Sequence, residues 1–124
     1  MAQEKNFEYK IKSYLKSIGA YFIKTHGDRF SRVGTPDIIA CINGHFVAVE
    51  VKAENGKPSE LQLYHLEQII KNAKGYGAFV IPTEGIKKIK NYINDKYPQY
   101  NYIPVIDFEK FVNFCENLLT GQQK

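Results

Sequence analysis

The chain has 124 residues, of which 44% are hydrophobic and 24% charged, and its formal net charge is +4. We expect one domain spanning residues 1–124, because the sequence contains no repeat and no linker. A membrane-spanning protein is excluded, because no apolar run approaches the roughly 20 residues that a helix needs to cross a bilayer. The first residues also lack the apolar stretch of a signal peptide, so we expect a cytoplasmic protein without a membrane partner.

The first predicted element is a helix over residues 5–18. Its apolar residues recur at helical spacing: Phe7, Ile11, Leu15 and Ile18. Gly19 is a typical helix-ending residue, and residues 20–24 are typical of a short strand. Residues 25–35 are rich in glycine and charge, which predicts a loop.

The next segment predicts a β-hairpin. Residues 37–42 form an apolar run, and residues 45–52 form a second run with alternating β-branched residues. Asn43 and Gly44 separate the two runs and are the strongest two-residue hairpin signal, because both tolerate a positive φ.

The later elements complete an α/β pattern. In chain order we predict a helix over residues 59–73, a strand over 78–81, a helix over 86–97, a loop over 98–104 and a helix over 107–119. The whole order predicts a mixed sheet flanked by helices. Cys41 and Cys115 lie in apolar patterns without metal-ligand spacing, and we expect two buried thiols.

The hairpin places two acids face to face. If Asn43 and Gly44 are the turn residues, counting outward along both strands sets Asp37 opposite Glu50. Opposed residues share one side of a sheet, with Cβ atoms roughly 4.5–5.5 Å apart. Lys52 lies two residues beyond Glu50 and therefore shares that side.

Two opposed carboxylates repel each other unless something compensates their charge. A divalent cation does so, and Mg²⁺ prefers a few carboxylates together with water and phosphate oxygens. Lys52 is placed to stabilise an attacking hydroxide or a phosphate. The alternative is that Glu50 and Lys52 form the solvated face of an edge strand, and a register slip of one residue would separate Asp37 from Glu50.

These residues resemble a known motif. Pro36-Asp37 followed by Glu50-Val51-Lys52 is similar to the motif of the PD-(D/E)XK nuclease superfamily. The wider segment resembles the VRR-NUC branch and phage or archaeal Holliday-junction-resolvase-like nucleases. It comprises Gly34 to Ile39, Phe46 to Lys52 and Ser59 to Gln62.

The resemblance implies a restriction-endonuclease-like αβββαβ core, with a mixed four-stranded sheet, over about residues 4–82, and a C-terminal helical extension over about 83–124. It also implies Mg²⁺-dependent hydrolysis of phosphodiester bonds in DNA, with Mn²⁺ as a substitute. Asp37 and Glu50 would be metal ligands together with the backbone carbonyl of Val51. Lys52 would position or activate the water.

The resemblance implies two further catalytic side chains. The family commonly supplies a glutamate from the first helix, and Glu4 and Glu8 are the candidates, one turn apart. We favour Glu8 as a metal ligand, because its distance in sequence from Leu15 and Gly19 is similar to the spacing in the family. The alternative is that Glu8 is a solvated residue of the helix. The family also often places a glutamine at the position of Gln62, whereas the local alternative is a capping box with Ser59.

Basic residues in the loop that leads into Asp37 and in the loop after Lys52 are candidates for DNA phosphate contacts. These are Lys24, His26, Arg29, Arg32 and Lys57. The alternative is a solvated basic loop. A second basic cluster, Lys87, Lys88 and Lys90, is more typical of a solvated helix face.

The sequence thus predicts a structure-selective DNA endonuclease acting on branched, flap or junction DNA. One alternative is a DNA-binding module on a nuclease fold that does not cut. Another is a sequence-specific restriction-type endonuclease, for which the chain is short. A homodimer would allow two cuts on opposite strands, and the final helix either supplies its partner surface or covers the sheet.

Overall fold

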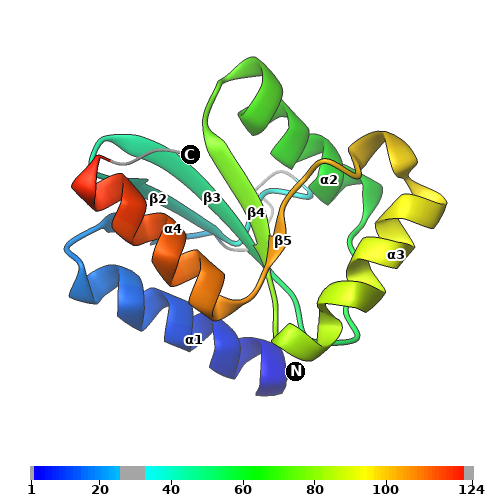
Figure 1. Ribbon diagram of the computed structural model, residues 1–124, viewed down its shortest axis with the longest axis horizontal. Coiled ribbons are helices and arrows are strands. Elements are labelled where there is room, and N and C mark those ends of the chain that lie inside the picture. Colours follow the sequence, from blue (N-terminus) through cyan, green and yellow to red (C-terminus); the bar gives the residue numbers. More distant parts are fainter. Residues whose placement is uncertain (1, 26–32, 122–124) are drawn as a thin grey trace.

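The computed structural model describes residues 2–25 and 33–121 (Figure 1). Its helices are α1 (Ala2–Ser17), α2 (Glu60–Glu67), α3 (Ile86–Lys96) and α4 (Phe108–Thr120). Its strands are β1 (Tyr21–Lys24), β2 (Ile38–Ile42), β3 (His45–Val51), β4 (Tyr76–Val80) and β5 (Val105–Ile106). A π-helical segment, Gln68–Asn72, extends α2, and short 3₁₀ turns span Thr83–Gly85 and Pro98–Tyr100.

The five strands form one mixed sheet in the order β1-β2-β3-β4-β5. The first three strands are antiparallel, whereas β4 and β5 each run parallel to their neighbour. The predicted α/β class with a mixed, helix-flanked sheet is confirmed, but the sheet has five strands instead of four. The fifth strand has two residues, too few to show any periodicity in the sequence. It forms because Val105 pairs with Phe79, which is distant from it in the chain.

Helices cover both faces of the sheet (Figure 1). On one face, α1 and α4 pack against β2 and β3 through Ile11, Leu15, Phe111, Cys115 and Leu118. On the other face, α2 and α3 form a second core with β3 and β4 through Leu63, Leu66, Ile89 and Ile93. Strand β3 lies between the two cores and its residues 47–51 are fully buried.

The hairpin register is confirmed. Ile42 pairs with His45, and Ile38 pairs with Val49. Asn43 and Gly44 have φ values of 49° and 84°, as the predicted two-residue turn requires. A slip of one residue, which would have turned Asp37 to the other side, is therefore ruled out.

The strand predicted over residues 78–81 begins two residues earlier. Gly77, which precedes the predicted strand, lies inside β4. A β-carbon at Gly77 would stand 3.0 Å from Cδ2 of Leu66, so the glycine permits close packing of α2 on the sheet. The predicted helix over residues 59–73 likewise changes character at Gln68, where the π-helical segment begins.

Two simpler expectations have different outcomes. Cys115 is buried as expected, but Cys41 is exposed, because α2 covers β3 and β4 and leaves the corresponding side of β2 open. Among the described helices, none is both long and apolar enough to cross a membrane.

Candidate active site

Two reciprocal hydrogen bonds join the acids at the open end of the hairpin. Asp37 lies one residue before β2 and Glu50 lies in β3, so that the strand pairing brings them opposite each other. The backbone N–H of Asp37 donates to Oε1 of Glu50 across 3.0 Å. The backbone N–H of Val51 donates to Oδ2 of Asp37 across 2.9 Å. The structure therefore brings together Asp37, Glu50 and Val51, three of the predicted metal ligands.

The two carboxyl groups have different environments. Glu50 is 1% exposed, whereas the Asp37 side chain is 24% exposed. Burial, and after it the negative charge of Asp37, raise the pKa of Glu50 to about 8, although the nearby Lys52 ammonium partly opposes the increase. A buried carboxyl group with a second acid beside it reduces folding stability. Such a pair is therefore typical of a functional site, where the function requires both acids.

A lysine connects the first helix to this pair. The Lys24 Nζ lies 3.7 Å from Oε1 of Glu8 and 3.9 Å from Oδ1 of Asp37. Lys12 lies 3.4 Å from the other oxygen of Glu8. Glu8 is thus linked to Asp37 through Lys24, and its role as a metal ligand stays a prediction, whereas Glu4 makes no ion pair with the described residues.

The donor set fits a hard divalent cation. Asp37 and Glu50 offer carboxylate oxygens, and the charge of the buried Glu50 lacks a cationic hydrogen-bond partner among the described residues. Within the same described ranges, no three acidic, histidine or cysteine side chains are grouped closely enough to hold a metal on their own. A Mg²⁺ ion here would therefore be held by the acid pair and would need backbone, water or phosphate oxygens as further ligands.

Lys52 follows directly after β3 and is half-buried. Its backbone N–H donates to the Val80 carbonyl across 3.3 Å, which extends the β3–β4 pairing by one residue. A β-carbon at Gly56 would stand 3.2 Å from both Cβ and Cδ of Lys52, so the loop that follows packs on the lysine stem. The packing restricts where the Lys52 ammonium group can point.

Gln62 makes the local one of its two predicted contacts. Its side-chain oxygen accepts a hydrogen bond from the Ser59 backbone N–H at 2.9 Å, and the Gln62 backbone N–H donates to the Ser59 hydroxyl at 3.1 Å. This is the full capping box at the start of α2. A contact with the acid pair would require the Gln62 side chain to leave the cap, so the catalytic assignment of Gln62 stays a prediction that this geometry does not support.

Two residues position Asp37 in ways that the sequence did not indicate. The Thr25 hydroxyl donates to the Pro36 carbonyl across 2.6 Å, and the Thr25 amide donates to the Asp37 carbonyl across 2.9 Å. Gly34 has a φ of 86°, and a β-carbon there would stand 2.7 Å from Cβ of Leu61. Both contacts join residues distant in the chain and leave no local sequence pattern. Only the glycine at position 34 could have indicated a close approach of the backbone.

The sequence model of the archaeal Holliday junction resolvase (Hjc) family matches residues 2–110, which include all of these site residues. The chain belongs to the archaeal Holliday junction resolvase family. The expected likeness to archaeal resolvase-like nucleases is therefore confirmed, whereas membership of the VRR-NUC branch stays a prediction. This membership supports a nuclease that acts on DNA.

One solved structure is similar to this resolvase-family chain. It is Hjc of Archaeoglobus fulgidus, described as a Holliday junction resolvase from an archaeal hyperthermophile. The two are 24% identical, the match covers 64% of this chain and 69% of that one, and the TM-score is 0.46. No curated protein matches the chain.

The residues predicted to contact DNA in this resolvase-family chain fall into two groups. His26, Arg29 and Arg32 lie outside the described residues. Lys24 faces Glu8 and Asp37, and Lys57 lies beside Tyr92 of α3. Lys24 therefore serves the acid cluster in this structure, and its role as a phosphate contact stays a prediction.

Proposed function

We propose that this chain is a metal-dependent DNA endonuclease that hydrolyses phosphodiester bonds at four-way junctions. The observation that carries the proposal is the pairing of Asp37 with the buried Glu50, close to Lys52, in a chain of the resolvase family. We assign Pro36-Asp37 and Glu50-Val51-Lys52 to the PD-(D/E)XK motif.

Each residue of the cluster has a defined task under this proposal. Asp37 and Glu50, with the Val51 carbonyl, would hold Mg²⁺ or Mn²⁺, which supplies Lewis acidity toward a phosphate oxygen when bound. Glu8 would contact the metal through a bound water, because no three acids among the described residues are grouped closely enough to hold it directly. Lys52 would donate a hydrogen bond to the attacking water or to the phosphate. Lys24 would neutralise Glu8 and Asp37 before substrate arrives, because its ammonium group lies within 4 Å of both.

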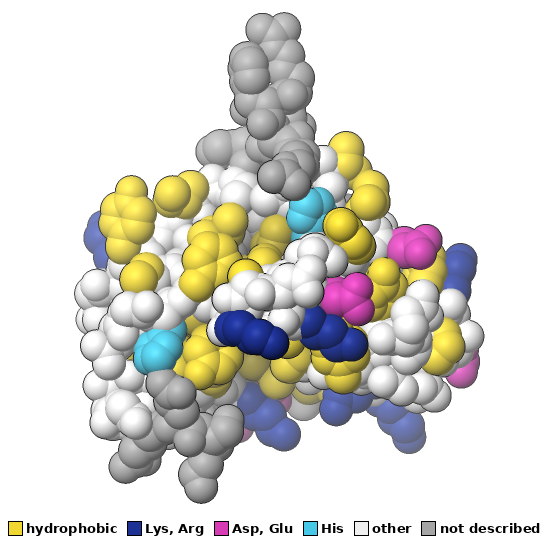
Figure 2. All heavy atoms as spheres, turned by 90° about the horizontal axis from the view of Figure 1, so that it is seen from above, with side chains coloured by type: hydrophobic (Ala, Val, Ile, Leu, Met, Phe, Trp, Pro, Cys, Tyr) yellow, Lys and Arg dark blue, Asp and Glu magenta, His cyan; other side chains and the backbone are white. Residues whose placement is uncertain are grey.

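We also propose that the enzyme acts as a homodimer, because paired cuts on opposite strands are most simply made by a two-fold pair of sites. The final helix buries its Phe111 and Leu118 in the core of the same chain, so these two residues are not available to a partner. The open side of β1 and β2 is the better candidate. Together with the start of β3 it exposes Tyr21, Ile23, Cys41 and Phe46, and Figure 2 shows hydrophobic side chains distributed over the face that it views.

A substrate panel tests the proposed activity. Labelled single-stranded, duplex, flap and four-way junction DNA would be incubated with Mg²⁺, Ca²⁺ or a chelator. We expect Mg²⁺-dependent cleavage of the junction, reduced at least about 100-fold in Asp37→Ala because a metal ligand is lost. The matched control is Asp95→Ala, which removes an exposed acid of α3.

The same panel separates the alternatives. Binding without a cleavage product in Mg²⁺ or Mn²⁺ would favour a non-cutting module. Cuts tied to one short sequence, independent of branching, would favour a restriction-type endonuclease. Sedimentation of the wild type against Tyr21→Glu tests the dimer, because a charge in a buried apolar interface opposes association.

A further inference from the structure

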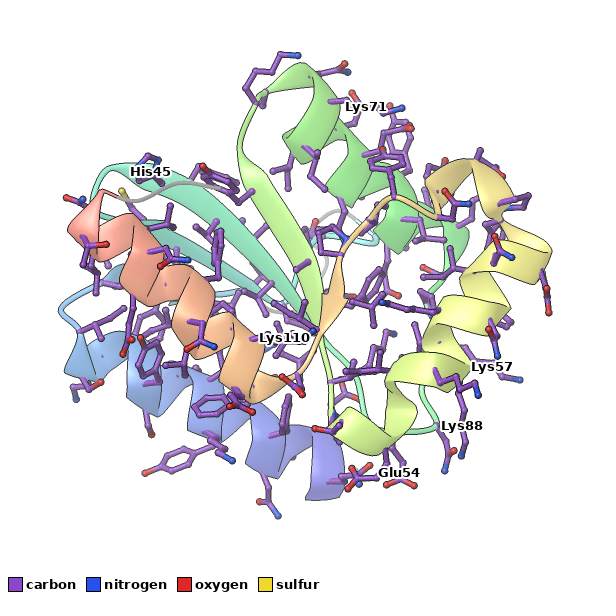
Figure 3. All side chains as sticks on the ribbon, in the orientation of Figure 1. His45, Glu54, Lys57, Lys71, Lys88 and Lys110 are labelled. Carbon is purple, nitrogen blue, oxygen red and sulfur yellow. The ribbon has the colours of Figure 1, made fainter. Side chains whose placement is uncertain are left out.

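A surface pocket of about 340 Å³ lies between the loop after β3 and α3. It is lined by Asn55, Gly56, Lys57, Lys88 and Tyr92. Figure 3 shows Lys57 and Lys88 on the same side of α3, whereas Glu54 lies toward the N-terminal end of α1. Lys88 was expected to belong to a merely solvated helix face, yet the fold places it beside Lys57, 31 positions earlier in the chain.

The two ammonium groups of this pocket are held by neutral partners. Lys88 donates to the side-chain oxygen of Asn55 across 2.9 Å, and the Lys57 Nζ lies 5.6 Å from the ring centre of Tyr92. Neither lysine forms an ion pair with a carboxylate anywhere in the described part of the chain. Their positive charge is therefore available to an anion.

One carboxylate close to the pocket in sequence is hydrogen-bonded to α1. Glu54 is in the same loop, but its side chain accepts a hydrogen bond from the Gln3 amide group across 3.2 Å, and its backbone N–H donates to the Gln3 side-chain oxygen across 3.0 Å. Both bonds hold the loop toward α1. They leave the Lys57 and Lys88 charges uncompensated within their own pocket.

Close packing fixes this pocket relative to Lys52. Gly56 packs on the Lys52 stem, and a β-carbon at Gly85, just before α3, would stand 2.5 Å from the Glu54 carbonyl oxygen. Lys57 lies five positions after Lys52, so their Cα atoms are at most about 18 Å apart. At about 3.4 Å per nucleotide along one strand, this distance corresponds to about five nucleotides.

We propose that the Lys57–Lys88 pocket binds a DNA backbone phosphate within about five nucleotides of the bond that is cut. The inference rests on the proposed function and names a second contact for the same substrate. Such a contact would fix the position of the junction arm over the acid pair, because a strand held at two points cannot slide. The ligand chemistry is that of a phosphate group, which free phosphate shares with DNA.

A salt series with a matched control tests the proposal. Junction binding would be measured by fluorescence anisotropy over a range of salt concentrations for the wild type and for Lys57→Gln/Lys88→Gln. We expect the log–log salt slope of the double variant to fall by about 1, because one phosphate contact is lost. Lys71→Gln is the control, since Lys71 also lies over a tyrosine ring, at 4.4 Å, but is paired with Glu67 at the far end of α2 (Figure 3).

A second measurement locates the phosphate. Single methylphosphonate groups, which are uncharged, would be introduced along the junction strands near the cut. One of them should weaken binding of the wild type and leave binding of the double variant unchanged. Because glutamine keeps most of the lysine stem and a polar end group, melting temperatures of both variants should remain at the wild-type value.

The outcomes are distinct. Equal salt slopes for the double variant and Lys71→Gln would overturn the proposed contact. A second result would also overturn it: inorganic phosphate raises the melting temperature of the wild type, but the salt slope of junction binding is the same for the double variant and the wild type. The pocket would then bind free phosphate and not DNA. Cleavage by the wild type is recorded in the same preparations, so that failure of this contact is separated from failure of the nuclease activity.

Discussion

The backbone N–H of Asp37 donates a hydrogen bond to the buried carboxyl group of Glu50, with 3.0 Å between nitrogen and oxygen. The Asp37 side chain in turn accepts from the amide that follows Glu50. Each acid is therefore oriented by backbone from the opposite strand, and neither depends on a flexible side chain for its position. This arrangement keeps two acids adjacent in the protein before any metal arrives, at the expense of a raised pKa for Glu50.

Glu50→Gln should stabilise the metal-free protein at alkaline pH. The pKa of Glu50 rises from an ordinary 4.5 to about 8 in the folded protein, so the folded state binds this proton more tightly than the unfolded state. The contribution of this proton to the free energy of unfolding is fully present below about pH 4.5. It is lost as the pH rises through about 8, by about 1.4 kcal/mol for each pH unit between these values. Glutamine keeps an oxygen for the Asp37 amide and carries no charge.

Melting temperatures in chelator from pH 5 to pH 9 measure this effect. The variant should exceed the wild type by a margin that grows between about pH 5 and pH 8. A margin that shrinks over that range, or that does not change, would contradict the raised pKa.

Divalent cations should stabilise the wild type more strongly as the pH rises. Glu50 must release its proton before it can bind a metal, so the affinity increases until the pH exceeds about 8. Thermal shifts with Mg²⁺ or Ca²⁺ at pH 6 and pH 8.5 check this, because a ligand of the folded state raises the melting temperature. Glu50→Gln should show little shift at either pH, and an equal wild-type shift at both would argue against Glu50 as a ligand.

Gly34→Ala should destabilise the protein more than Gly19→Ala. Both glycines have a positive φ, 86° and 75°, but only the new β-carbon at Gly34 would meet other atoms, 2.7 Å from Cβ of Leu61. The backbone strain alone costs roughly 1–2 kcal/mol, and the clash adds about as much again.

Urea unfolding of the two alanine variants provides the comparison. Junction cleavage by Gly34→Ala should also fall, because the loop before Asp37 can no longer pack on α2. Equal losses of stability for Gly34→Ala and Gly19→Ala would show that the close approach to Leu61 is unimportant.

Gln62 variants distinguish capping from catalysis. Gln62→Ala should lower stability by about 1 kcal/mol, since the Ser59 amide loses its acceptor. Gln62→Glu keeps that acceptor, and we expect wild-type stability and wild-type cleavage. A tenfold loss of cleavage in Gln62→Glu at unchanged melting temperature would instead establish a catalytic role for the amide group.

The sequence alone determined the hairpin and the acid pair. Asn43 and Gly44 set the turn through their backbone conformation, and the alternation of the strands then fixed Asp37 opposite Glu50. These features depend on residues within 15 positions of each other, which is why local patterns sufficed. The same locality explains why the capping box of Ser59 and Gln62 was anticipated.

Contacts between distant segments were decided only by the tertiary structure. The bridge from Lys24 to Glu8 and Asp37, the pairing of Val105 with Phe79 and the meeting of Lys57 with Lys88 each join residues from separate elements. No sequence period links such residues, because their approach depends on how helices pack on the two faces of the sheet. The chemistry of the acid pair is therefore specified locally, whereas its counter-charges and its further phosphate contact arise from packing.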